Sequence, residues 1–496
     1  MRGASAIGLV LALLTTAASG QAGPDEAARI AGEGIAIGSP FGAGGDPQTS
    51  VAQPDTSAKP SANLNTSIAE GFGPAGDPGG DRAFLKTKGI EYSLTYIGEL
   101  LGNATGGARR GAIAEGRLDV QVDMDLEKLA GWTGAAIHAN AYQIHGTGLS
   151  RYYVDNLITV SAIEALPASR LYEAWFEQKL FDGRLALRAG QLAADTEFAV
   201  SQTGTLFINS TFGWPNIMAV ILPSGGPIYP LATPGARIKL MPNRNLSFQA
   251  GLYDGDPAGP VRPGLDPDPQ RRNRTGTSFR TGDPALAIAE ISYAYNIDKG
   301  STGEPGTVTL GGWYHFGRFT SLDRDTAGRA LADPATTGIG RRFRGNTGIY
   351  GIIDQTIYRE PDDPNDGASV FLRLSGSPGD RNLLDLYLDA GIAYKGLFPG
   401  RSDDTLGLAF ALSRVAPGAR QADLDGILFS GIGQPRRSAE AVLEATYQAV
   451  LGPGITLQPD IQYVFKPSGG VRNPRDPDLG RVKNAAVFGL RATIRY

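Results

Sequence analysis

The sequence predicts an all-β protein, a transmembrane antiparallel β-barrel of about sixteen strands, and three observations predict it. Many segments alternate strictly between apolar and polar residues, as strands with two different faces do. Many of these segments are close to the roughly nine to eleven residues that a tilted strand needs to cross a bilayer. Shorter connections alternate with longer ones along the chain, which is typical of outer-membrane barrels.

The composition excludes several other classes of protein. The chain has 496 residues, of which 41% are hydrophobic, and its mean hydropathy of -0.16 excludes a helical membrane protein. The formal charge is only -4, so no large basic field favours a nucleic acid partner. There is no Cys and there are three His, which excludes disulfides and thiolate chemistry and leaves little material for a metal centre. We therefore expect no cofactor and no bound metal.

The N-terminus predicts export. Arg2 precedes an apolar run over residues 6–19 that is short for a bilayer span, and we interpret residues 1–22 as a signal peptide. Residues 23–87 are rich in Gly, Ala, Pro, Ser and Asp and lack sustained periodicity, which indicates a flexible N-terminal segment. The barrel is then expected over residues 88–496.

The stretch "RLDVQVDMDL" at residues 117–126 shows the alternation most clearly, because Leu118 and Val120 flank Asp119 and the pattern continues to Leu126. Such a strand has one apolar and one hydrophilic face. The same pattern, with four weaker cases, predicts strands at 91–98, 117–126, 136–142, 171–180, 184–191, 236–240, 246–253, 289–295, 307–316, 347–358, 369–375, 384–394, 405–412, 443–451, 456–465 and 485–496.

The connections predict which end of the barrel is which. Shorter ones, such as 181–184, 241–245 and 451–454, fit periplasmic turns, and the first and last strands then meet the periplasm. The longer ones fit external loops, and they cover about 143–169, 191–235, 254–285, 317–346 and 414–438.

The two faces of the strands fit water on one side and lipid on the other. Alternation alone would also suit a large soluble β protein with one wet face, which is the alternative architecture. However, aromatic residues such as Tyr92, Tyr463 and Tyr496 lie near strand ends, as in an interfacial girdle. A closed barrel also leaves no sheet edge unpaired in lipid. We therefore expect the polar residues to line a water-filled lumen.

Several long motifs stand out, at residues 173–196, 197–215, 222–239, 250–259, 444–470 and 489–496. They resemble the carbohydrate-selective porins of Gram-negative outer membranes, the OprB-like family. This resemblance implies a sixteen-stranded porin, a homotrimer that passes mono- or small oligosaccharides by passive diffusion. It also implies an outer-membrane location among lipid and lipopolysaccharide, and biogenesis by the barrel-assembly machinery, which would read the terminal Tyr496. The likeness covers most of residues 88–496.

The candidate site is the wall and loop that would narrow the pore. A neutral sugar needs donors and acceptors in place of water, and an aromatic face for its C–H groups. Strand parity gives one set of candidates, and the resemblance implies that the third external loop, about 191–235, folds inward and gives the others. The candidate pore-lining residues are Glu173, Trp175, Glu177, Arg184, Arg188, Asp195, Glu197, Asn209 and Trp214.

Two other functions are weighed against a sugar porin. A porin for organic acids or other small polar solutes would need an Arg/Lys ladder unopposed by acids, whereas here both signs of charge appear. A barrel-borne hydrolase would need a nucleophile and a placed base, and the sequence has no Gly-x-Ser-x-Gly motif with such a His. We interpret His138 and His315 as wall residues, and we predict no catalytic residues and no enzyme activity.

Overall fold

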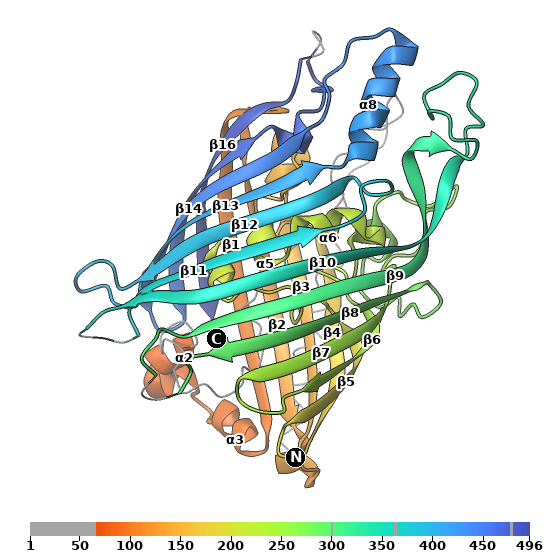
Figure 1. Cartoon of the computed structure of the whole chain (residues 1–496). Helices are drawn as coiled ribbons and strands as arrows, with labels where there is room; N and C mark the ends of the chain where they lie inside the picture. Colours follow the sequence, from red (N-terminus) through yellow and green to blue (C-terminus); the bar gives the residue numbers. More distant parts are fainter. Residues whose placement is uncertain (1–65, 299–300, 362, 364, 477–479) are drawn as a thin grey trace.

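The strands of the protein close into a barrel. The computed structural model describes residues 66–496, apart from 299–300, 362, 364 and 477–479, so the predicted signal peptide lies outside the described residues. In the described part, sixteen antiparallel strands form one closed sheet in which β1 pairs with β16 (Figure 1). The predicted fold is confirmed, and each of the sixteen predicted segments coincides with one strand.

The strands follow one another around the barrel in chain order. They are β1 (Ile90–Gly107), β2 (Gly111–Asp125), β3 (Ala135–Gly146), β4 (Ala168–Leu180), β5 (Leu185–Leu192), β6 (Thr233–Leu240), β7 (Leu246–Asp254), β8 (Ala285–Tyr295), β9 (Gly306–Asp325), β10 (Gly340–Arg359), β11 (Gly367–Gly376), β12 (Leu384–Lys395), β13 (Thr405–Val415), β14 (Ala439–Gly452), β15 (Ile455–Phe465) and β16 (Lys483–Arg495).

Short helical segments occupy the connections and the rim. They are α2 (Ile68–Gly71), η2 (Gly73–Gly76), α3 (Asp81–Thr87), α4 (Leu126–Ala130), η3 (Ser150–Val154), η4 (Thr203–Leu206), α5 (Ser210–Gly213), α6 (Asn216–Ile221), η5 (Pro223–Gly225), α7 (Pro269–Arg272), α8 (Pro417–Ser430) and η6 (Pro467–Gly469). No helix in the described ranges is both long and apolar enough to pass through a membrane.

The alternation of residues sorts the two faces of the wall. On β2, Arg117, Asp119 and Gln121 are buried inside the barrel, while the intervening Leu118 and Val120 are only half-buried. The outward face is apolar and exposed at many positions, which suits a wall in contact with hydrocarbon. Examples of these exposed side chains are Leu100, Leu310, Ile349, Leu408 and Phe488.

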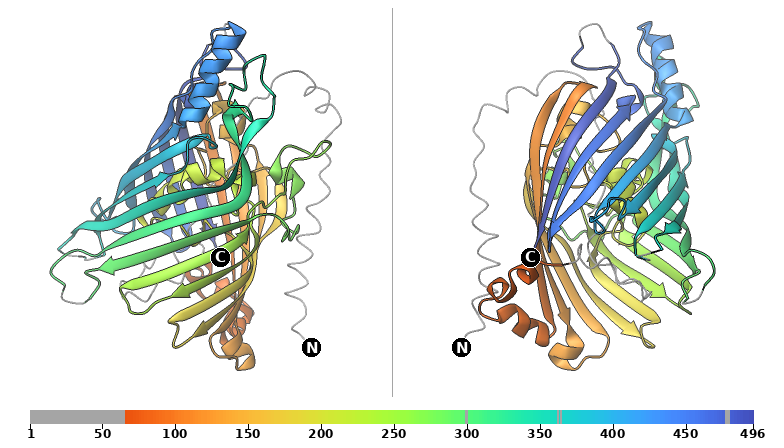
Figure 2. Two further views of the ribbon diagram at one scale, coloured as in Figure 1. Left: turned by 45° about the vertical axis from the view of Figure 1, so that its right-hand side comes forward. Right: turned by 90° about the vertical axis from the view of Figure 1, so that its left-hand side faces the viewer.

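The described part of the N-terminal segment, residues 66–87, packs against the periplasmic end of the barrel. The Tyr496 hydroxyl donates to the carbonyl of Gly76 at 3.0 Å, and the Arg82 guanidinium lies 4.9 Å from the Tyr496 ring centroid. Figure 2 shows this helical segment beside the C-terminus. The part of the predicted flexible segment that the structure describes is therefore helical over α2, η2 and α3.

Two external connections differ from the prediction. β9 and β10 each have 20 residues, so the loop expected at 317–346 is reduced to 326–339. At the external ends of these two strands, Arg and Thr take the place of apolar residues. The strands still pair, because backbone hydrogen bonds outside the bilayer do not require an apolar face. Helix α8 lies within the expected loop 414–438; it starts at a Pro and ends before Gly431, which is left-handed at φ 67°.

The largest apolar cluster lies inside the barrel, between the wall and the third external loop, 193–232. Phe207, Phe212 and Trp214 of the loop pack with Phe371 and Tyr387 of the wall. Figures 1 and 2 show α5 and α6 within the ring of strands. Gly residues of the wall permit this approach: a Cβ on Gly407 would lie 2.9 Å from the Phe207 ring.

Candidate pore site

A cluster of four charges connects the third external loop to three neighbouring strands. Glu177, Arg188 and Arg237 lie side by side because the strand register pairs Glu177 with Arg188 and Arg188 with Arg237. Glu197 of the loop completes the cluster. Arg188 lies 2.9 Å from Glu177 and 2.6 Å from Glu197, and Arg237 lies 3.0 Å and 2.6 Å from the same two acids. Two acids and two bases thus compensate one another.

The two arginines determine the ionisation of the loop acid. Burial alone would raise the pKa of Glu197, but the positive charge of Arg188 and the hydrogen bond and charge of Arg237 outweigh it, so the pKa lies below its usual value. Glu197 is therefore ionised at neutral pH. Lys239 lies two residues beyond Arg237 on the same face of β6 and adds a positive charge next to the cluster.

An aromatic side chain flanks the cluster. The Arg188 guanidinium carbon lies 3.6 Å from the ring centroid of Trp175, which is stacking distance. The His138 ring stacks on Trp175 at 4.8 Å, and His138 Nδ1 lies 2.7 Å from Asp123. Trp175 is half-buried. The site therefore combines charged donors and acceptors with a partly accessible aromatic face.

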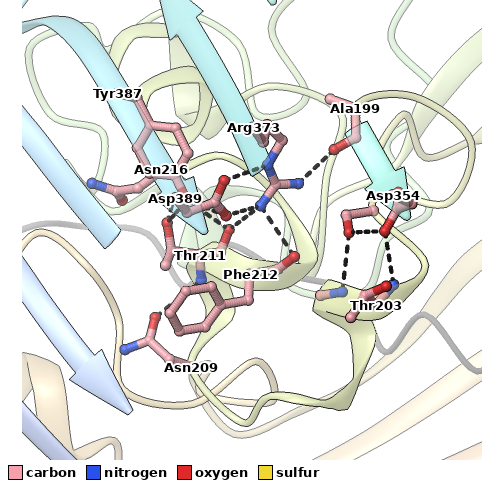
Figure 3. Close-up of polar contacts among 12 residues, drawn as sticks. Ala199, Thr203, Asn209, Thr211, Phe212, Asn216, Asp354, Arg373, Tyr387 and Asp389 are labelled. Atoms are coloured by element: carbon pink, nitrogen blue, oxygen red, sulfur yellow. Dashed lines mark hydrogen bonds and ion pairs between the residues drawn. The ribbon is translucent and has the colours of Figure 1, made fainter. Parts of the chain in front are cut away.

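One arginine of the wall binds three backbone carbonyls of the loop. Arg373 donates to the carbonyls of Ala199 at 2.6 Å, Thr211 at 2.7 Å and Phe212 at 3.1 Å (Figure 3). Asp389 lies 2.5 Å from Arg373 and compensates its charge, and both side chains are fully buried. The wall thus satisfies carbonyls that the irregular loop cannot pair within itself.

Carboxylates of the wall bind backbone amides of the same loop. Asp354 of β10 accepts from the Ser201 hydroxyl at 2.6 Å and the Thr203 amide at 3.1 Å (Figure 3). Glu444 of β14 accepts from the Ile208 and Asn209 amides at 2.6 and 3.0 Å. Together with Arg373, these anchors join the loop to β10, β11 and β14.

The structure brings four of the predicted site residues together. Trp175, Glu177, Arg188 and Glu197 all belong to the cluster or stack on it. Arg184, in contrast, is exposed in the turn between β4 and β5 and does not belong to the strand wall. The strand begins one residue later than predicted, at Leu185, because residues 181–184 form the turn.

The other four predicted residues are buried and hold the loop. Glu173 accepts from the Ala193 amide at 2.9 Å, and Asp195 accepts from the amide of Tyr229 at 2.9 Å. Asn209 donates to Gln462 at 2.9 Å and caps α5, and Trp214 is only 1% exposed within the apolar cluster. These contacts give the four residues a structural part in holding the loop, and their contact with a solute stays a prediction.

Sequence reasoning missed several residues of the site. Arg237 and Lys239 could have been found, since the alternation in "ARIKL" puts both on the polar face. The anchors Arg373, Asp389 and Asp354 gave no such signal. Arg373 and Asp354 lie more than 150 positions along the chain from the loop residues that they bind, and only the closed barrel brings them together.

Comparison with known proteins fits this architecture. The model of the carbohydrate-selective porin family, OprB family, matches residues 109–496. The chain belongs to the OprB family. It is similar to Porin B of Pseudomonas aeruginosa, at 24% identity over 85% of this chain and 92% of that protein. The high-pH structure of Pseudomonas putida OprB has the same fold, with a TM-score of 0.74 at 23% identity over 85% of this chain and 97% of that chain.

Membership of the OprB family and the closed barrel establish the protein as an outer-membrane porin of a Gram-negative bacterium. Both findings point to a channel rather than an enzyme. The family is described as carbohydrate-selective.

Proposed function

We propose that the protein lets mono- and small oligosaccharides diffuse passively through its lumen, and that loop 193–232 narrows the passage. The observation that carries this proposal is the loop itself, which side chains of β10, β11 and β14 hold by its backbone. Its Glu197 completes the charge cluster of the opposite wall. A loop tied to several sides of the barrel obstructs part of the lumen.

The chemistry of the cluster favours neutral polar solutes. Glu177 and Glu197 offset Arg188 and Arg237 at 2.6 to 3.0 Å, so the cluster attracts neither sign of ion strongly. Guanidinium groups and carboxylates still offer donors and acceptors that replace water around sugar hydroxyls. Trp175 adds an apolar face beside them.

Liposome swelling tests this function. We expect proteoliposomes to swell quickly in glucose and more slowly as the saccharide grows, and to swell more slowly in organic anions of glucose size. The variant E177Q/E197Q leaves two arginines unopposed and should raise anion entry relative to glucose. E304Q, in an exposed pair with Arg359, is the matched control. Faster entry of organic anions than of glucose in the wild type would contradict the proposal.

One observation supports a second candidate, a porin for organic acids. Lys239, beside Arg237 on β6, and Lys179, 4.0 Å from Glu177, add positive charge to the balanced cluster, and an excess of positive charge favours anions. The same swelling series separates the two candidates, because an organic-acid porin would pass the anions faster than glucose.

We also propose a homotrimer, on the strength of the family resemblance. The mass of the detergent-solubilised protein under mild conditions tests it. Three copies of the 52.1 kDa chain are expected, less any cleaved leader, and the mass of a single chain would contradict it.

A further inference from the structure

The external ends of β9 and β10 carry a row of exposed arginines. Arg318 of β9 lies directly opposite Arg344 of β10. Arg342 precedes Arg344 by two residues, nearer the external end of β10, and lies opposite Thr320. All three arginines are exposed. These strand ends rise at the right of Figure 1. We refer to Arg318, Arg342 and Arg344 as the arginine row.

The arginine row belongs to the outer face of the barrel. Along β9, Tyr314, Phe316 and Arg318 are exposed, while His315 and Gly317 between them are buried. The Phe319 ring packs against the inward His315 at 5.3 Å, so Arg318 continues the outward side of Phe316. Arg344 and Arg342 share that side through their pairing with Arg318 and Thr320.

The arginine row has no ion-pair partner in the part of the chain that the structure describes. Among the residues that the structure describes, no side chain forms an ion pair or a hydrogen bond with the guanidinium of any of the three. Two nearby arginines differ, since Arg324 pairs with Asp323 and Arg381 with Asp380. Like charges directly opposite one another destabilise a strand pair. An external anion would remove that repulsion.

The position of the row indicates which anion. Tyr314 and Phe316 are 42% and 59% exposed and continue the apolar outer wall. Arg318 lies two residues beyond Phe316, or about 7 Å along the strand. Aromatic side chains on a barrel wall mark the edge of the hydrocarbon, so the row lies where lipid headgroups begin. A molecule that has an anionic group at this level and apolar chains against the wall below it is a lipid, and its anionic group is a phosphate.

We propose that the arginine row binds the phosphate groups of an acylated, phosphorylated glycolipid of the outer leaflet, of the lipid A type. Guanidinium groups bind phosphate through two parallel hydrogen bonds, and three of them in a row suit a headgroup with two phosphates. The acyl chains then lie on Tyr314, Phe316 and the apolar wall below them. The proposal rests on the outer-membrane location and not on which solute passes the pore.

Binding of purified lipid A to the full-length protein in detergent tests the proposal. We expect bisphosphorylated lipid A to bind at least about tenfold more tightly than the same lipid without phosphates. The triple variant R318Q/R342Q/R344Q should lose that difference. The control R110Q/R262Q/R436Q removes three exposed arginines from other external connections and should keep it.

Three outcomes would overturn the proposal. The first is equal affinity of the wild type and the arginine-row variant for bisphosphorylated lipid A. The second is an equal loss of this preference in the control variant, which would indicate that the net charge of the protein, and not a specific site, causes the binding. The third is competition by inorganic phosphate at the concentration of the lipid, which would indicate a site for free phosphate. Heat-modifiable migration of both variants verifies that each barrel is folded.

Discussion

Arg373 of β11 and Asp389 of β12 form an ion pair in which neither side chain is exposed, and the arginine uses its remaining donors on the third external loop. Tyr387 donates to the same carboxylate at 2.8 Å. A buried pair of this kind adds little stability by itself, since desolvation offsets the attraction. Its consequence here is positional, because it fixes one side of loop 193–232 to the wall.

Replacing Arg373 with Met should loosen the loop and destabilise the barrel. The change leaves Asp389 buried without its counter-charge, which costs about 3–5 kcal/mol. It also leaves the Ala199 and Phe212 carbonyls without their Arg373 donor, while the Thr211 carbonyl keeps only the Tyr387 hydroxyl. We expect a lower unfolding temperature in detergent and a larger single-channel conductance.

Two comparisons make this result specific. R414M breaks a pair with Asp385 on the neighbouring strand in which the arginine itself is exposed, and we expect it to cost under about 1 kcal/mol. In R373M/D389L no unpaired charge remains, so the unfolding temperature should recover in part while the conductance stays raised. A conductance of R373M equal to that of the wild type would show that Arg373 does not hold the loop.

Replacing Trp175 with Ala should weaken sugar recognition. The change removes the aromatic face and frees Arg188, whose guanidinium lies 3.6 Å from the ring. Sugar-induced reduction of the ion current measures the effect, and we expect a several-fold rise in the half-saturating concentration. W132A is the control, since Trp132 is 54% exposed in a periplasmic turn. Equal half-saturation of W175A and the wild type would exclude Trp175 from the sugar path.

Glu197 should make part of the stability depend on pH. Arg188 and Arg237 hold the pKa of Glu197 below its usual value despite the opposing effect of burial. Its contribution is therefore fully present above the unfolded pKa, about 4.3, and is lost as pH falls through the lower folded pKa. The difference in unfolding temperature between the wild type and E197Q should be largest near neutral pH and should shrink below about pH 4. E70Q, in the exposed α2, should show no such trend.

Most of the strands could be predicted from the two-residue alternation of apolar and polar side chains. Particular residues show why the external strand ends could not. The alternation of Leu118, Asp119 and Val120 indicates a strand with one face toward lipid and the other toward water. The external part of β9 lies outside that contrast, since Arg318 and Thr320 are both polar and exposed. The strand is held there by backbone hydrogen bonds to β10. These bonds do not require alternating apolar residues, so the sequence gives no pattern for this part of the strand.

The candidate site was predictable only where the strand register alone assembles it. Glu177 and Arg188 are joined by a short turn, so their pairing across it could be expected from parity. Glu444 and Ile208 are 236 positions apart, and their hydrogen bond exists only because the barrel closes around the loop. For the same reason Asn209, expected beside the solute, is buried against Gln462.

The central claim is that loop 193–232 narrows the passage, and the size limit for saccharides in a shortened variant tests it most directly. Deleting residues 205–216 removes the amides that Glu444 binds and two of the carbonyls that Arg373 binds. Deleting residues 431–435, in the external connection after α8, is the control. We predict that the first deletion alone raises single-channel conductance and admits larger saccharides in liposome swelling. An unchanged conductance and size limit in the folded 205–216 deletion would contradict the claim and place the constriction elsewhere.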